Sequence, residues 1–247
     1  MWREDDSAAT LGPRTVAAIP ARLGSTRLPR KPLLDLGGAP VVWRVYEAVR
    51  QANMVDAVWV VTDSDEIEAA VRDRGGEVRR VDAPCRSGTE RVARALLQDR
   101  SSTVEHVLNI QGDEPFVGAD LLRPLLDALS AGAEIATLSA PLVEAERGVR
   151  HRVKVVTDRH RQALYFSREA IPGDLHLGYY GFRAETLRRL LDLPRSPLAE
   201  AEDLEQLDWL HAGLKIAVAH APRATQSIDT AEDLTAARTL LRETRSP

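Results

Sequence analysis

The sequence predicts an α/β fold in which a mainly parallel central sheet is flanked by helices and carries a small strand-rich lobe. Short apolar runs rich in β-branched residues alternate with amphipathic stretches of helical spacing through most of the chain. This alternation is typical of right-handed crossovers between parallel strands. The 247 residues are 44% hydrophobic and 28% charged, so the chain can bury a sizeable core.

The first half of the chain supplies most of the predicted sheet. Its apolar runs predict buried strands at 15–20, 57–62, 106–110 and 134–142. Helical spacing predicts helices at 41–52, 65–75, 89–98 and 120–132. Ligands of such sheets bind beyond the carboxyl ends of the strands. We therefore expect the candidate site along one edge, at the loops after AAIP, VVT, VRRVDAP and LNI.

The second half is less regular and supplies the predicted strand-rich lobe. Strand-like runs lie at 153–157, 162–168, 177–183 and 215–221, and helices are predicted at about 184–192 and 198–212. A final helix is predicted after Thr230, where TAED forms a capping box with Asp233. Without a linker or repeat in the sequence, we expect one domain over 15–247, preceded by a disordered leader over 1–14.

Composition excludes several classes of function. The formal net charge of −4 and pI near 5.9 argue against a broad nucleic-acid surface. No apolar run approaches the ~20 residues that a membrane-spanning helix needs, and the first residues lack the apolar core of a secretory signal. Cys85 is the only cysteine, which excludes an internal disulfide and favours a cytoplasmic protein.

The loop ARLGSTRLPRKPL (21–33) concentrates cations in an otherwise acidic chain. It follows the first predicted strand and contains Arg22, Arg27, Arg30 and Lys31. A solvated turn decorated with charges would explain this pattern. That is the default for a cluster of charges. A phosphate pocket is the more specific alternative, because cations and free backbone N–H groups after a strand are what a polyphosphate requires.

Carboxylates lie at two further loop positions. NIQGDEP (109–115) ends a buried strand and presents Asp113 and Glu114, while Asp229 precedes the final helix. Mg²⁺ binds one or two protein carboxylates together with phosphate oxygens and water, so these loops are candidate metal sites. The alternatives are a solvated turn for Asp113 and a helix cap for Asp229. CRSGTER (85–91) could hold a ribose or base through Ser87 and Gly88, or simply begin a helix.

The order of these motifs is more specific than any one of them. STRLPRKPL, SGTER, QGDEP, LYFSR, HLGYYG and IDTAEDL closely resemble, in this order, the 3-deoxy-manno-octulosonate cytidylyltransferases, a group of sugar nucleotidyltransferases. The resemblance covers residues 15 to about 240. It implies a Rossmann-like nucleotidyltransferase fold, and an enzyme that transfers CMP from CTP to the anomeric hydroxyl of a 2-keto-3-deoxy sugar acid and releases pyrophosphate.

The resemblance also implies roles for individual residues. Catalytic roles fall to Arg22, Lys31, Asp113 and Asp229, the two aspartates binding Mg²⁺. The nucleotide would contact Ala21, Arg22, Ser25, Lys31, Ser87, Gly88 and Gln111. The sugar acid would contact Arg27, Gln111, His176, Tyr180, Glu205 and Gln206. Packing at a strand end for His176 and a solvated helix face for Glu205 remain alternatives.

The chain departs from the resemblance in two places. Relatives carry Asn-Pro-Asn before VKVV, where this chain has GVRHR, and they carry an extended segment before HLGYYG, where it has only GDL. A cytidylyltransferase for another acidic acceptor, or a catalytically idle nucleotide-binding protein, therefore remains open. CTP and an acidic sugar are the expected partners, with no nucleic acid or membrane, and dimers are usual in the family, so a homodimer is expected.

Overall fold

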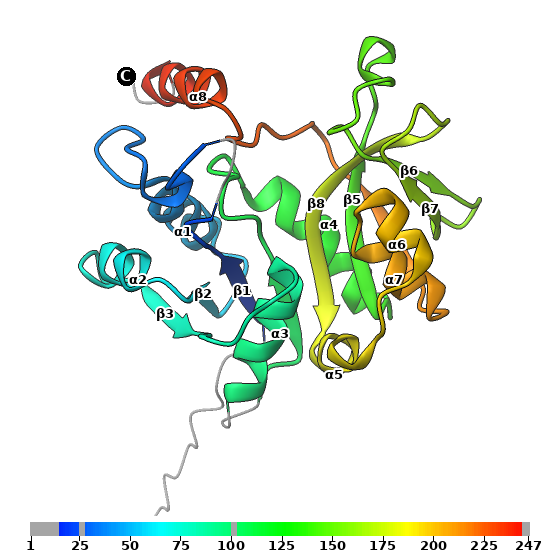
Figure 1. Ribbon diagram of the computed structural model, residues 1–247, viewed down its shortest axis with the longest axis horizontal. Helices are drawn as coiled ribbons and strands as arrows, with labels where there is room; N and C mark the ends of the chain where they lie inside the picture. The colour runs from blue at the N-terminus through cyan, green and yellow to red at the C-terminus, as the bar shows by residue number, and fades with distance from the viewer. Residues whose placement is uncertain (1–14, 25–27, 100–102, 244–247) are drawn as a thin grey trace, which may run out of the picture.

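The computed structural model describes residues 15–24, 28–99 and 103–243, so the predicted leader 1–14 lies outside it. Nine strands of the described chain form one twisted sheet (Figure 1). Seven of them follow the order β3-β2-β1-β4-β8-β5-β9, and β6 and β7 extend from β8 as a separate ribbon. The predicted α/β class, with helices around the sheet and a strand-rich lobe, is confirmed.

The strands agree with the predicted apolar runs. β1 (Thr15–Pro20), β2 (Ala57–Thr62), β3 (Glu77–Arg80) and β4 (His106–Asn109) are parallel to one another, as are β5 (Ile135–Ala140) and β9 (Ile216–His220). β8 (Asp174–Arg183) runs antiparallel to both β4 and β5 and joins the two parallel halves. β6 (Lys154–Thr157) and β7 (Ala163–Ser167) form the lobe.

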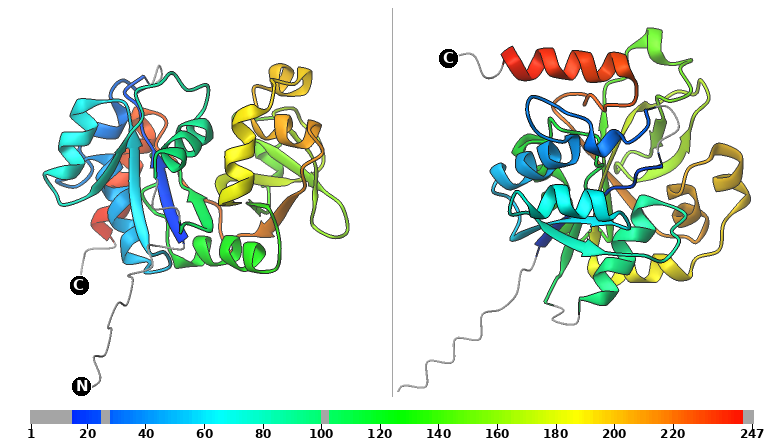
Figure 2. Two further views of the ribbon diagram at one scale, coloured as in Figure 1. Left: turned by 90° about the horizontal axis from the view of Figure 1, so that it is seen from below. Right: turned by 60° about the vertical axis from the view of Figure 1, so that its left-hand side comes forward.

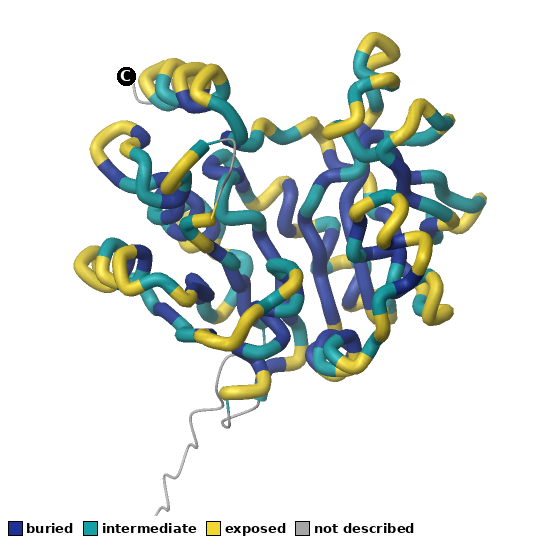
Figure 3. The backbone as a smooth tube through the Cα atoms, viewed as in Figure 1, coloured by how far each residue is buried: buried dark blue, intermediate teal, exposed yellow. Residues whose placement is uncertain are grey.

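Helices cover both faces of the sheet (Figure 2). On one face, α1 (Val41–Gln51), α2 (Asp65–Arg72) and α4 (Ala119–Ser130) pack their apolar sides against the strands. On the other face lie α3 (Gly88–Gln98), α5 (Ala184–Arg189) and α7 (Gln206–His211). The strands are buried from both sides, which explains why their sequences are nearly continuous apolar runs; Figure 3 shows the buried centre.

The single helix predicted over 198–212 is wrong. Two short helices occupy the segment, α6 (Pro197–Glu202) and α7, separated at Asp203, whose φ of 52° is left-handed. The Arg168 guanidinium donates hydrogen bonds to the main-chain carbonyls of Glu202 and Asp203, and so satisfies the end of α6. The break places Glu205 at the start of α7 rather than along a solvated helix face.

The final helix, α8 (Ala231–Glu243), begins as predicted. The Thr230 hydroxyl accepts a hydrogen bond from the Asp233 main-chain N–H at 3.2 Å, and the Asp233 carboxylate accepts one from the Thr230 N–H at 2.9 Å. This reciprocal pair is the predicted capping box. α8 packs on the loop after β1 through Leu234 and Ala237, which brings the segment before it to the edge of the sheet.

Candidate active site

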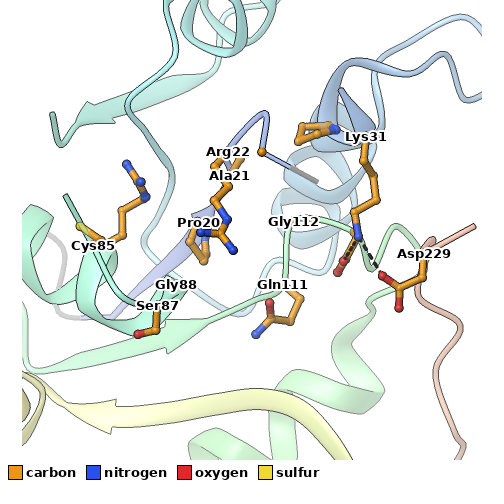
Figure 4. Close-up of a pocket in the computed structure, with 14 residues that line it drawn as sticks. Pro20, Ala21, Arg22, Lys31, Cys85, Ser87, Gly88, Gln111, Gly112 and Asp229 are labelled. Carbon is orange, nitrogen blue, oxygen red and sulfur yellow. Dashed lines mark hydrogen bonds and ion pairs between the residues drawn. The ribbon is translucent and has the colours of Figure 1, made fainter. Parts of the chain in front are cut away.

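A cavity of about 360 Å³ lies beyond the carboxyl ends of β1 and β4 (Figure 4). Its walls come from five segments of chain: the loop after β1, the short 3-10 helix Lys31–Leu33, the start of α3, the loop after β4 and the segment before α8. Seven predicted residues line it: Ala21, Arg22, Lys31, Ser87, Gly88, Gln111 and Asp113, and Asp229 joins them from the segment before α8. Ser25 lies outside the described residues.

Two glycines allow the walls to approach β1 closely. A Cβ at position 112 would lie 2.8 Å from the Pro20 carbonyl oxygen, and one at position 88 would lie 3.0 Å from the Pro20 ring. Any larger residue at 112 would therefore force the QGDEP loop away from β1. Gly88 of SGTER and Gly112 of QGDEP are therefore needed for steric reasons, because they allow these two loops to approach the end of β1.

Lys31 lies between the two predicted metal ligands. Its ammonium donates to the Asp113 carboxylate at 2.5 Å and to the Asp229 carboxylate at 3.0 Å, and its side chain is only 13% exposed. Burial alone would lower the pKa of Lys31, but attraction to these carboxylates outweighs it and the pKa is raised. The main chain reinforces the contact, because the Ile228 N–H donates to the Asp113 carbonyl at 2.9 Å.

The side chain of Asp229 does not cap α8. Thr230 and Asp233 perform that function, and the Asp229 carboxylate faces Lys31 instead. Asp229 contributes to the cap through its main chain, whose N–H donates to the Asp233 carboxylate at 3.0 Å, while its own carboxylate pairs with Lys31. A solvated turn is excluded for Asp113, whose carboxylate is held by a largely buried ammonium.

The carboxylates suit a divalent cation that arrives with a phosphate. Among the described residues, no group of three or more His, Cys, Asp or Glu side chains could hold a metal by itself. Two carboxylates around one cationic atom, however, are the protein share of a typical Mg²⁺ site, in which phosphate and water complete the octahedron.

A second cavity of about 590 Å³ adjoins the first. Both are lined by Arg22, Ser87 and Gln111, which therefore lie at their junction. The exposed Arg22 side chain has no ion pair among the described residues, and the Gln111 amide donates to the Gly178 carbonyl at 3.1 Å. Five residues predicted to contact the sugar line this second cavity: Gln111, His176, Tyr180, Glu205 and Gln206. Arg27, the remaining one, lies outside the described residues.

His176 is held as a neutral imidazole. The Thr137 hydroxyl lies 2.9 Å from its Nε2 and donates its single proton to the Tyr179 carbonyl at 2.8 Å. By this network the hydroxyl oxygen accepts from Nε2–H, which leaves Nδ1 as a hydrogen-bond acceptor. Burial lowers the pKa of His176 to about 3, so it stays neutral between about pH 5 and 8.

Glu205 is anchored to the start of α3. Its carboxylate accepts a hydrogen bond from the Thr89 hydroxyl at 2.7 Å. Burial raises the pKa of Glu205, while hydrogen bonds from Ser87 and Thr89 oppose that rise. Tyr180 is buried beside it in an aromatic cluster with His176, Phe182 and Trp209.

Several residues of the second cavity were not predicted to bind either substrate. Glu114 is buried there, and its carboxylate accepts hydrogen bonds from Tyr179 at 3.1 Å and Thr225 at 3.2 Å. Burial, with Asp113 adjacent, raises the pKa of Glu114 to about 7. Four arginines also line it, Arg86, Arg152, Arg168 and Arg195, together with His151. Their positions on four different segments gave no local signal, although Glu114 follows Asp113 directly.

A mainly parallel sheet carries at its strand ends an acidic pair, a largely buried lysine and an arginine that has no ion pair within residues 15–24, 28–99 and 103–243, an arrangement typical of a nucleotidyltransferase of the α/β class. Comparison with known proteins gives the family. A cytidylyltransferase family model matches residues 16–216. The 3-deoxy-manno-octulosonate cytidylyltransferase of Anaeromyxobacter sp. (strain Fw109-5) is 42% identical over 92% of this chain and 97% of that protein. Its counterpart in Nitrobacter hamburgensis is 40% identical over 92% and 93%.

Solved structures agree with these relatives. CMP:2-keto-3-deoxy-manno-octonic acid synthetase complexed with CTP superimposes with a TM-score of 0.88 and 35% identity, over 94% of this chain and 99% of that one. A cytidylyltransferase from Leptospira borgpetersenii, 19% identical with a TM-score of 0.66, shares the fold. The chain belongs to the 3-deoxy-manno-octulosonate cytidylyltransferase family, as its ordered motifs predicted. No helix in the described ranges is long and apolar enough to cross a membrane.

Proposed function

We propose that this protein transfers CMP from CTP to the anomeric hydroxyl of a 2-keto-3-deoxy sugar acid, 3-deoxy-manno-octulosonate or a close analogue. The observation that carries the proposal is the pair of adjoining cavities that share Arg22, Ser87 and Gln111. The first has the size and polar walls that a nucleoside triphosphate needs. The second is lined by Arg22 and Arg168, which have no ion pair among the described residues and could bind the carboxylate of an acid, and by three arginines that already pair with carboxylates. The junction of the two cavities is where the reacting atoms would meet.

The reaction needs charge neutralisation and alignment more than acid–base chemistry. The anomeric oxygen attacks the α-phosphorus of CTP, an oxygen–phosphorus bond forms, the bond to the bridging oxygen breaks, pyrophosphate leaves and the hydroxyl proton passes to water. Arg22 and Lys31 would offset the charge that develops on the phosphates. Asp113 and Asp229 would hold Mg²⁺, which when bound polarises the phosphate and lowers the pKa of the attacking hydroxyl.

Lys31 would neutralise negative charge both in the substrate-free protein and in the protein with nucleotide bound. Without nucleotide its ammonium lies between Asp113 and Asp229. A triphosphate offers that ammonium a second set of anionic partners, and Mg²⁺ offers the carboxylates a second cation. If these partners exchange, each charge among Lys31, Asp113 and Asp229 remains next to an opposite charge, as charges removed from water require.

The second cavity would bind the acceptor. Neutral His176 would accept a hydrogen bond from a sugar hydroxyl through Nδ1, and Glu205 and Gln206 would bind further hydroxyls. Both departures from the family pattern lie at this cavity, since His151 and Arg152 of GVRHR and Leu175 of GDL line it. The part of the acceptor that reaches these residues would therefore contact side chains that differ from those in the family pattern. A homodimer remains part of the proposal on the resemblance alone, and a cytoplasmic location on the single cysteine, Cys85.

The proposal predicts strict nucleotide choice. With Mg²⁺, CTP should stabilise the protein against heat more than ATP, GTP or UTP does, because only a ligand that prefers the folded state stabilises it. Pyrophosphate should be released when CTP and 3-deoxy-manno-octulosonate are both present. Equal thermal shifts with all four nucleotides would contradict the cytidine assignment. Pyrophosphate release with another sugar acid alone would change the acceptor and leave the reaction intact.

A further prediction concerns His176. His176→Ala should raise the KM for the acceptor about tenfold or more, the usual effect of losing one hydrogen bond from a buried polar group. The Kd for CTP should change less than about twofold, since His176 lines only the acceptor cavity. His211→Ala, on the exposed end of α7, is the matched control. If His176→Ala lowered the affinity for CTP as much as it lowered turnover, His176 would belong to the nucleotide site instead of the acceptor site.

A further inference from the structure

The start of α3 lies between the two cavities and faces both. Its N-cap residue Ser87 and the following Gly88 line the first cavity. Thr89, the next residue, is only 2% exposed and turns away from that cavity toward Glu205. One turn of helix therefore connects the proposed nucleotide site with a carboxylate that lines the proposed acceptor site.

The Thr89 hydroxyl is oriented by a second buried side chain. Its oxygen accepts a hydrogen bond from the Asn109 amide at 3.0 Å, and its proton goes to the Glu205 carboxylate at 2.7 Å. Asn109 ends β4 and is fully buried, and its Oδ1 has no hydrogen-bond partner among the described residues. Burial of the Asn109 amide with its Oδ1 unpaired costs free energy of folding. The hydrogen bond that the amide donates to Thr89 explains why an asparagine is present at this position.

We propose that Thr89 is a positioning residue for the acceptor, because it fixes the Glu205 carboxylate within the acceptor cavity and ties it to the helix that contacts the nucleotide. The relay runs from Asn109 at the end of β4, through Thr89 on α3, to Glu205 at the start of α7. The main chain of Glu205 begins α7 after the break at Asp203, and the Thr89 hydroxyl holds its carboxylate from α3. The inference rests on the proposed function.

A consequence is coupling between the two substrates. Contacts of the nucleotide with Ser87 and Gly88 would fix the position of the first turn of α3. The hydrogen bond from the Thr89 hydroxyl would then fix the position of the Glu205 carboxylate as well. The acceptor would then bind more tightly to the CTP-loaded protein than to the free protein. By linkage, the acceptor would raise the affinity for CTP by the same factor.

Thr89→Val tests the inference, because valine keeps the shape of threonine and removes only the hydroxyl. It should raise the KM for the acceptor about 10- to 100-fold, the range for a lost hydrogen bond to a charged group. The Kd for CTP, measured by calorimetry without acceptor, should change less than about twofold. Thr89→Ser restores a hydroxyl and should bring the acceptor KM back to within about threefold of the wild type.

The controls separate positioning from packing. Thr186→Val makes the same isosteric change in a buried threonine of α5, outside both cavities, and should leave both constants unchanged. If Thr89→Ser were as poor as Thr89→Val, the methyl group and not the hydroxyl would matter, and the inference would be overturned. A normal acceptor KM in Thr89→Val would overturn it as well. Failure of the wild type to use any sugar acid would instead reject the proposed function.

Discussion

Asp229→Asn should lower Mg²⁺-dependent pyrophosphate release by about a thousandfold, which corresponds to about 4 kcal/mol of transition-state stabilisation. The substitution keeps the size of the side chain and removes its charge, so the fold should persist. Its carboxylate faces Lys31 and takes no part in capping α8, which leaves the amide no compensating function there. Turnover and the midpoint of thermal unfolding, measured on the same preparation, check both halves of this expectation.

Asp113→Asn should behave alike, and the double variant should lose much less than the product of the two single losses. Both carboxylates act through one cation, so removal of either disables the same cluster. Asp233→Asn is the matched control: it changes a carboxylate four residues away that caps α8, and should affect stability more than turnover. Near wild-type turnover in Asp229→Asn would remove Asp229 from the site.

The strand ends that build the site could be predicted from sequence because each carries a local signal. A buried apolar run followed by Gly and a carboxylate, as in QGDEP, indicates both the end of a strand and the edge where ligands bind. The capping box at Thr230 is likewise contained within four residues. These features depend on chain neighbours alone, so their placement agrees between sequence and structure.

What could not be predicted depends on contacts between distant segments. Lys31 meets Asp113 and Asp229 across 82 and 198 positions, and composition gives no indication of that pairing. The break at Asp203 is stabilised by Arg168, 35 positions before it, so helical spacing alone suggested a continuous helix. The resemblance identified Glu205 as a candidate. Its contact with Thr89, and that of Thr89 with Asn109, arise only when these distant segments pack together in the fold.

Lys31→Met should change the protein's affinities for metal and nucleotide in opposite directions. In the free protein the Lys31 ammonium occupies the space between the Asp113 and Asp229 carboxylates, where a divalent cation would compete with it. Methionine keeps the length of the side chain without the charge, and so removes the cation that the two adjacent carboxylates share. Binding of Mn²⁺ as a probe, followed by electron paramagnetic resonance without nucleotide, should therefore strengthen about tenfold or more, because like charges favour a bridging cation.

The same variant should bind CTP about 10- to 100-fold more weakly, because a partly buried cation no longer meets the triphosphate. Arg30→Met is the matched control: it removes a cation from the adjacent position, but Arg30 pairs with the exposed Glu66 outside the cavity. Both affinities should remain near those of the wild type in that variant. Unchanged Mn²⁺ binding in Lys31→Met would mean that lysine and metal occupy different positions, and the exchange of partners would fail. Stronger metal binding with weaker CTP binding is an outcome that simple damage to the fold would not produce, because damage lowers both.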